Sequence, residues 1–153
     1  MKVWQGLYAM VWLIVLELLV AIDPRPPSWS IYVHVALGVL IVVLATGNFV
    51  GVRRTSAPGR TKRTVRATLG LSVAMVPLGV LLWADVGAAW QVLLGYSFWD
   101  LVHVLHVVLA LAILAQAASA ATAYDMWEEQ EFSQNTTPGE TPPPPQGRPK
   151  TVH

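Results

Sequence analysis

The stretch WSIYVHVALGVLIVVLATGNFV, residues 29–50, contains no aspartate, glutamate, lysine or arginine. About 20 apolar residues in a helix are enough to cross the hydrocarbon core of a bilayer, which is about 30 Å thick. Three further runs, at residues 3–22, 67–84 and 99–124, are similarly long and apolar. The sequence therefore predicts an all-α membrane protein with four transmembrane helices in an up-down bundle.

Composition excludes several kinds of site. The chain of 153 residues has no cysteine, which rules out disulfides, zinc thiolates and iron–sulfur clusters. We find no glycine-rich phosphate loop, no Ser/His/Asp arrangement and no nucleic-acid-binding signature, so nucleic acid is not an expected partner. The first apolar run is followed by Asp23-Pro24-Arg25 rather than by small residues, so no cleavable signal peptide is expected.

The charge distribution predicts the orientation in the membrane. Residues 53–66 contain six basic residues and no acidic one. Basic loops stay on the cytoplasmic side of a membrane. With four spans, both termini of this multi-pass protein are then cytoplasmic, and the protein is expected in the plasma membrane with the lipid bilayer around it.

Two segments outside the spans have their own expected structures. Residues 86–96 are apolar but too short to cross the bilayer, so we expect an interfacial helix or a re-entrant cap on the outer face. Residues 1–124 form the predicted bundle, and residues 125–153 a cytoplasmic tail. That tail begins with an acidic helical extension and continues into a proline-rich part that is expected to be largely disordered.

The two halves of the bundle resemble each other. Residues 9–16 (AMVWLIVL) and 74–81 (AMVPLGVL) are identical at six of eight positions. His34-Val-Ala-Leu in the second span likewise matches His106-Val-Val-Leu in the fourth. Two duplicated helical hairpins would explain both matches, although apolar helices also match by chance.

The matched histidines are the main candidates for a functional site. A histidine inside a membrane span is costly and usually functional. His34 and His106 lie about 8–10 Å inside the outer boundary, on spans that run in the same direction and can face each other across a bundle. We therefore predict that both ligate one haem iron, with b-type haem favoured. The alternative is that each histidine only donates a hydrogen bond to a neighbouring helix.

Four other residues are secondary candidates. His103, one helical turn from His106, is an alternative iron ligand or a contact for a propionate or substrate. Glu17 is a carboxylate inside a span and a candidate catalytic group, which could orient an imidazole N–H, relay protons, or simply reach the interface. Arg25 suits a haem propionate or lies free in a solvated loop. Asp100 is a candidate N-cap of the fourth span.

These features resemble one half of haem A synthase, a family built from two four-helix bundles with a histidine near the outer end of the second and fourth helices. The resemblance covers residues 5–124 and includes His106-Val-Val-Leu-Ala110, which is similar to the family phrase His-x-x-x-Ala. It implies haem binding and oxidation of haem O to haem A. The family phrase Glu-x-x-His-Arg is not kept, because Ile31 and Val35 stand where it has Glu and Arg, and the paired loop cysteines are absent.

The sequence therefore favours an integral membrane haem-binding redox protein. It would be either a compact haem A synthase-like oxidoreductase acting on haem O or an electron-transferring b-type cytochrome working with quinol. The alternative is a cofactor-free accessory subunit or assembly factor that binds subunits of a respiratory complex, with its tail as the docking arm. A small transporter ranks last, because four short helices offer little room for a pathway.

Overall fold

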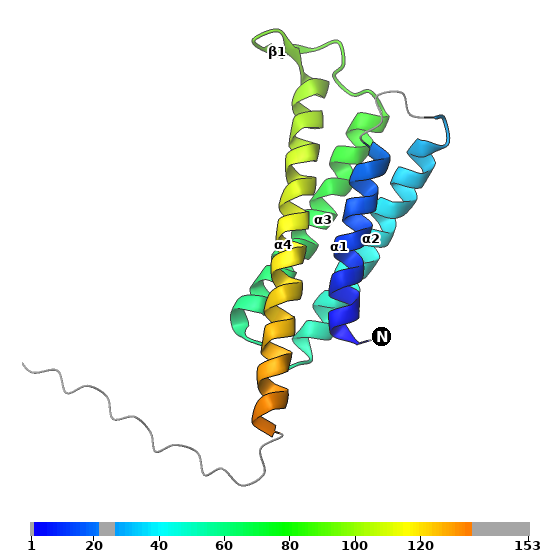
Figure 1. Cartoon of the computed structure of the whole chain (residues 1–153). Helices are drawn as coiled ribbons and strands as arrows, with labels where there is room; N and C mark the ends of the chain where they lie inside the picture. The colour runs from blue at the N-terminus through cyan, green and yellow to red at the C-terminus, as the bar shows by residue number, and fades with distance from the viewer. Residues whose placement is uncertain (1, 22–26, 136–153) are drawn as a thin grey trace, which may run out of the picture.

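The computed structural model describes residues 2–21 and 27–135. These residues form four helices, namely α1 (Val3–Ala21), α2 (Ser30–Arg53), α3 (Gly59–Trp83) and α4 (Phe98–Asn135), and two short strands, β1 (Gln91–Leu93) and β2 (Tyr96–Ser97) (Figure 1). Each helix is long and apolar enough to cross a membrane. Apolar chains favour helices in such a setting because a helix satisfies its backbone polar groups internally.

The helices follow one another around the molecule. α1 packs against α2, α2 against α3, α3 against α4, and α4 closes the ring against α1. Successive helices run in opposite directions, with β1 and β2 beyond one end and the α2–α3 connection, residues 54–58, at the other (Figure 1). We call these the hairpin end and the loop end. α2 and α4 therefore lie diagonally across the bundle, and both descend from the hairpin end.

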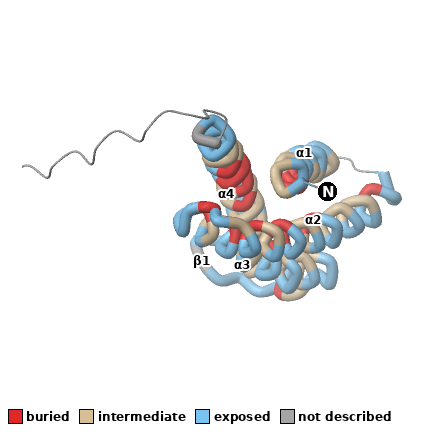
Figure 2. The backbone as a smooth tube through the Cα atoms, turned by 90° about the horizontal axis from the view of Figure 1, so that it is seen from below, coloured by how far each residue is buried: buried red, intermediate tan, exposed pale blue. Residues whose placement is uncertain are grey.

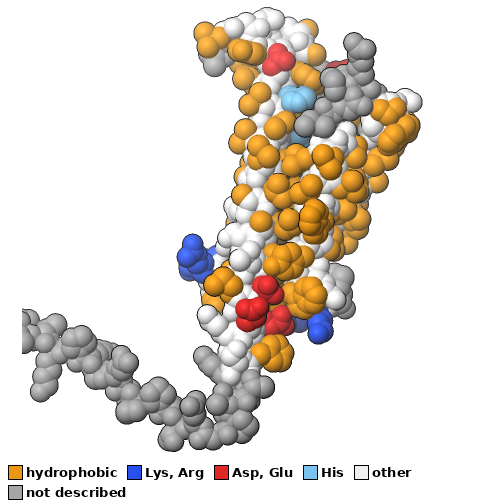
Figure 3. All heavy atoms as spheres, viewed as in Figure 1, with side chains coloured by type: hydrophobic (Ala, Val, Ile, Leu, Met, Phe, Trp, Pro, Cys, Tyr) orange, Lys and Arg blue, Asp and Glu red, His pale blue; other side chains and the backbone are white. Residues whose placement is uncertain are grey.

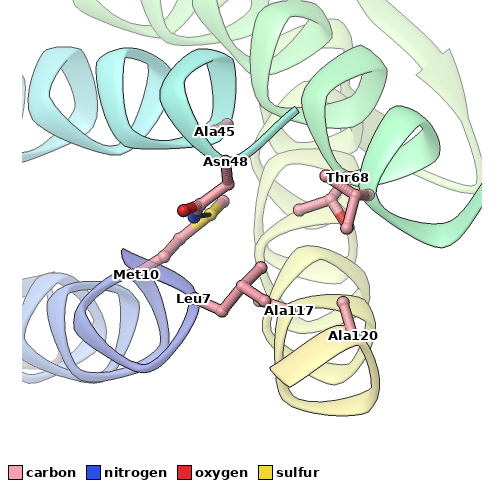
Figure 4. A pocket seen from close by; sticks show the side chains of 8 residues that line it. Leu7, Met10, Ala45, Asn48, Thr68, Ala117 and Ala120 are labelled. Atoms are coloured by element: carbon pink, nitrogen blue, oxygen red, sulfur yellow. Dashed lines mark hydrogen bonds between the residues drawn. The ribbon is translucent and has the colours of Figure 1, made fainter. Parts of the chain in front are cut away.

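The half of the bundle toward the loop end is closely packed. Two clusters of buried residues fill it, one around Leu7, Val52 and Tyr124 and the next around Met10 and Ile41. The cavity between them measures only about 10 Å³, the lower limit for a single water. Figure 4 shows its lining, with side chains from all four helices converging on it. The interior of this half has no room for a large ligand, and the larger hollow of about 460 Å³ between α3 and α4 is open to the surface.

The half toward the hairpin end is looser. Figure 2 shows buried, half-buried and exposed positions on the helices, seen from below. In the middle of this half, between the close-packed clusters and the hairpin end, no described residue is buried. The buried residues that bound this level are Ile14 on α1, Ser30 and Ile41 on α2, Ser72 on α3, and Val102 and Ile113 on α4. The side chains of the hairpin-end half are therefore less deeply buried than those of the loop-end half.

The segment that follows α3 differs from the prediction. Residues 86–96 form turns and the antiparallel β1–β2 hairpin, so the expected interfacial helix is wrong, while the alternative of a re-entrant cap stays a prediction. Asp85, Gly87, Leu94 and Gly95 all have positive φ angles, between 50° and 85°. A right-handed helix cannot contain such residues. At Gly87, a Cβ would lie 2.5 Å from the ring of Phe98, so the chain also needs a glycine there.

The start of α4 corrects another prediction. Asp100 is not the N-cap; Ser97 occupies that place, immediately before Phe98. The Ser97 backbone N–H and hydroxyl both donate to Oδ2 of Asp100, at 2.8 and 2.7 Å, and the Asp100 N–H donates back to Ser97 Oγ at 3.1 Å. This reciprocal pair is a capping box. It joins β2 directly to α4.

The helices also extend beyond the apolar runs. α3 begins at Gly59 rather than near residue 67, and α4 continues past Tyr124 through the acidic segment to Asn135. Hydropathy marks where a helix is apolar, and a helix can continue with polar residues beyond that point. The proline-rich part of the predicted tail lies in residues 136–153, outside the described residues.

Candidate functional site

His34 and His106 lie together in the looser half of the bundle. Their ring centroids are 6.1 Å apart, with the ring planes at 44° to each other. His34 comes from α2 and His106 from α4, so the two side chains approach each other from diagonal helices. The structure thus brings together the two histidines that the repeated phrase singled out.

Glu17 joins this pair from α1. Its Oε1 lies 3.0 Å from Nδ1 of His34, and its side chain is only 13% exposed. The distance is that of a hydrogen bond, but the alignment is not. Among the described residues, three buried polar atoms here have no hydrogen-bond partner: Nδ1 of His34, Oε2 of Glu17 and Nδ1 of His106. Such atoms are rare in folded proteins, and a cluster of three marks a place where a ligand is expected.

Two glycines give the cluster its space. A Cβ at Gly38 on α2 would lie 3.7 Å from Oε1 of Glu17, and one at Gly79 on α3 would lie 3.6 Å from Cε1 of His106. A larger side chain at either position would press on these groups. With Gly79, all four helices contribute to the site.

The contact between Gly79 and His106 was not predicted from the sequence. The repeat does contain a signal for it, because Gly79 stands where the first half has Ile14. Ile14 packs in the core of the loop-end half. At this position of the repeat, the first copy therefore has an isoleucine that packs in the core, and the second copy has a glycine that lies beside a histidine.

The remaining candidates lie elsewhere. His103 is exposed, and its ring packs against Trp99 with centroids 5.1 Å apart, so it does not join the cluster. Arg25 lies in residues 22–26, outside the described residues, and its contact with a propionate stays a prediction. Figure 3 shows histidine side chains near the hairpin end, while the visible lysines and arginines lie toward the loop end.

The donor set suits haem better than a bare metal ion. Protein sites for bare metals use three or more side-chain ligands, and the described residues contain no group of three His, Asp or Glu arranged to hold one. Haem iron needs only axial ligands from the protein. Bonds from imidazole nitrogen to a metal are about 2 Å long, so one iron between two imidazoles requires ring centroids roughly 6 Å apart. The observed 6.1 Å fits this requirement.

Comparisons with protein-family models, curated proteins and solved structures gave no match for this chain. The resemblance to haem A synthase stays a hypothesis that depends on His34, His106 and the order of the helices. Ile31 and Val35, where the family phrase has Glu and Arg, are 40% and 53% exposed apolar side chains. Neither position supplies a polar group to the cluster, and among the described residues the carboxylate beside His34 is that of Glu17.

Proposed function

We propose that this protein is an integral membrane haem protein that transfers electrons, with one b-type haem held between His34 and His106. The four helices span the membrane, the loop end faces the cytoplasm, and the haem lies near the outer face. The observation that carries the proposal is the 6.1 Å approach of two imidazoles from diagonal helices. The shallower burial in this half of the bundle, and Nδ1 of His106, which has no hydrogen-bond partner among the described residues, support it.

The chain's own residues account for holding such a group. Each imidazole would offer one nitrogen to the iron. The other nitrogen of His34 would face Glu17, whereas Nδ1 of His106 has no hydrogen-bond partner among the described residues. The close-packed half below, around Met10 and Ile41, separates the site from the loop end. Haem, when bound, supplies a one-electron couple whose potential depends on its axial ligands and surroundings.

Electron transfer is favoured over oxygenation. Two protein ligands leave no open axial position on the iron at which oxygen could bind, and this arrangement suits an electron carrier. The acid and the arginine of the haem A synthase phrase are also replaced by Ile31 and Val35. A quinol in the bilayer or a subunit of a respiratory complex would then be the redox partner.

The visible spectrum of the purified protein tests haem binding. In detergent, the wild type from haem-replete cells should show a sharp Soret band and, after dithionite reduction, the narrow bands of a low-spin haem. His34→Ala and His106→Ala should each lose this spectrum, because each removes one axial ligand. His103→Ala is the matched control on the same helix as His106, and it should keep the spectrum since His103 is exposed and packs on Trp99.

Three outcomes would change the conclusion. A colourless wild type would reject the haem and favour the cofactor-free accessory subunit. Loss of the low-spin spectrum in His103→Ala but not in His106→Ala would show that His103, and not His106, is the iron ligand. Pigment extracted after coexpression with a haem O source should be haem b, and recovery of haem A would instead favour a haem A synthase.

A further inference from the structure

Glu17 gives the two histidines unequal surroundings. Nδ1 of neither histidine makes a well-aligned hydrogen bond to a described residue, but His34 has a carboxylate oxygen 3.0 Å from its Nδ1 and His106 has none beside it. Across the helix interface, His106 lies against Gly79, which offers no side chain. The candidate site therefore contains one imidazole beside an acid and one imidazole without any such partner.

The position of the acid determines which nitrogen of His34 is free. A carboxylate oxygen within hydrogen-bond distance stabilises the tautomer that carries its proton on Nδ1. Nε2 is then unprotonated, and it lies on the side of the ring away from Glu17. Neutral imidazole binds metals through such a nitrogen, and a carboxylate on the other nitrogen fixes the ring and makes it a stronger electron donor.

A glycine on α2 lies beside this carboxylate. Gly38 lies one helical turn below His34 on α2, and a side chain there would meet Oε1 of Glu17. Because Glu17 is only 13% exposed and faces His34, it is not an acid that has extended to the surface. A carboxylate kept inside an apolar bundle needs a partner of this kind, since its desolvation is costly.

We infer that Glu17 is a positioning residue for His34, which fixes its ligating tautomer and lowers the reduction potential of the haem. This inference rests on the proposed haem function. In its ionised form, Glu17 would favour the oxidised, more positive iron, and the stronger donation from His34 would act in the same direction. Glu17 touches neither the iron nor a substrate in this role, and it acts only through the imidazole.

The test compares midpoint potentials in redox titrations of the purified holoprotein. Glu17→Gln keeps an oxygen acceptor near Nδ1 but removes the charge, so the equilibrium constant for reduction should rise about tenfold, or about 59 mV for a one-electron couple. Glu17→Asp keeps the charge on a shorter side chain, and its potential should fall between the two. The low-spin electron paramagnetic resonance signal should shift in the same order, because it reports on the axial imidazole.

The matched control is Leu16→Gln. Leu16 lies at nearly the same depth on α1 but is 46% exposed, so its amide would point away from His34 and leave the potential unchanged. A wild type with haem and a Glu17→Gln variant with the same potential and resonance signal would reject the inference while the haem function stands. A wild type without haem would reject the proposed function itself. If Glu17→Gln does not fold, the Glu17→Asp variant serves as the test. A midpoint potential and a resonance signal equal to those of the wild type in Glu17→Asp would then reject the positioning role of Glu17.

Discussion

Asn48 introduces an amide into the close-packed half of the bundle, where its side chain is 5% exposed. Its Nδ2 donates to the Gly6 carbonyl at 3.0 Å and lies 3.8 Å from Sδ of Met10, so it links α2 to α1 (Figure 4 shows Asn48 beside Met10). Asn48→Ala should lower the free energy of unfolding by about 1 kcal/mol, the usual value of a hydrogen bond between membrane helices. Denaturation in detergent micelles measures this loss.

Thr46→Ala is the control for that measurement. Thr46 is on the same helix, but it is exposed and its hydroxyl donates to the Val42 carbonyl within α2. Its replacement should therefore change the free energy of unfolding by less than about 0.5 kcal/mol. Equal losses for the two variants would show that Asn48 does not link the helices.

The sequence identified part of the candidate site at the level of residues. His34 and His106 stand out because each interrupts an apolar run in the same phrase. Glu17 was also recognised, but its contact with His34 was not, because that contact depends on the register between α1 and α2. Glycines have no side-chain chemistry to read, so the roles of Gly38 and Gly79 emerge only when the neighbouring helices are in place.

Among the elements, the start of α4 depends on one pair of residues. Ser97 and Asp100 form the capping box that joins the β1–β2 hairpin to the helix carrying His106. Asp100→Ala removes the acceptor of the Ser97 N–H, and it should cost about 1 kcal/mol of stability, as the loss of a helix cap does. Thermal unfolding followed by circular dichroism measures the change.

Asp100→Asn separates the cap from the charge. The amide keeps an oxygen acceptor for the Ser97 N–H, so this variant should lose clearly less stability than Asp100→Ala. If both variants unfold at the wild-type temperature, the box contributes nothing to the stability of α4.

The same region shows why the helices were predicted from the sequence but the β1–β2 hairpin was not. Long apolar runs give helices, and the four spans follow from length and hydropathy alone. Residues 86–96 are also apolar, but hydropathy contains no information about backbone angles. Gly87 and Gly95 were the available signals of a turn, whereas the positive φ of Leu94 contradicts the preference of its residue type and had no signal in the sequence.

For the whole molecule, the two ends differ in charge. The loop end combines the six basic residues of 53–66 with the acidic part of α4, and these parts touch, because the Ser56 hydroxyl donates to Glu131 at 3.4 Å. The hairpin end instead exposes aromatic and apolar side chains, including Trp90 and Leu94. A basic loop is costly to move across a membrane, and we therefore expect the loop end to stay in the cytoplasm.

Single-cysteine labelling tests this orientation directly, because the natural chain contains no cysteine. Leu94→Cys at the hairpin end, where the side chain is 89% exposed, should react with a membrane-impermeant maleimide in intact cells. Ser56→Cys at the loop end should react only after the cells are permeabilised, and Ala45→Cys, in the core, in neither case. The reverse pattern would move the histidine cluster to the cytoplasmic side. Labelling of both ends in intact cells would contradict a bundle that spans the membrane, and with it the proposed haem site inside the bilayer.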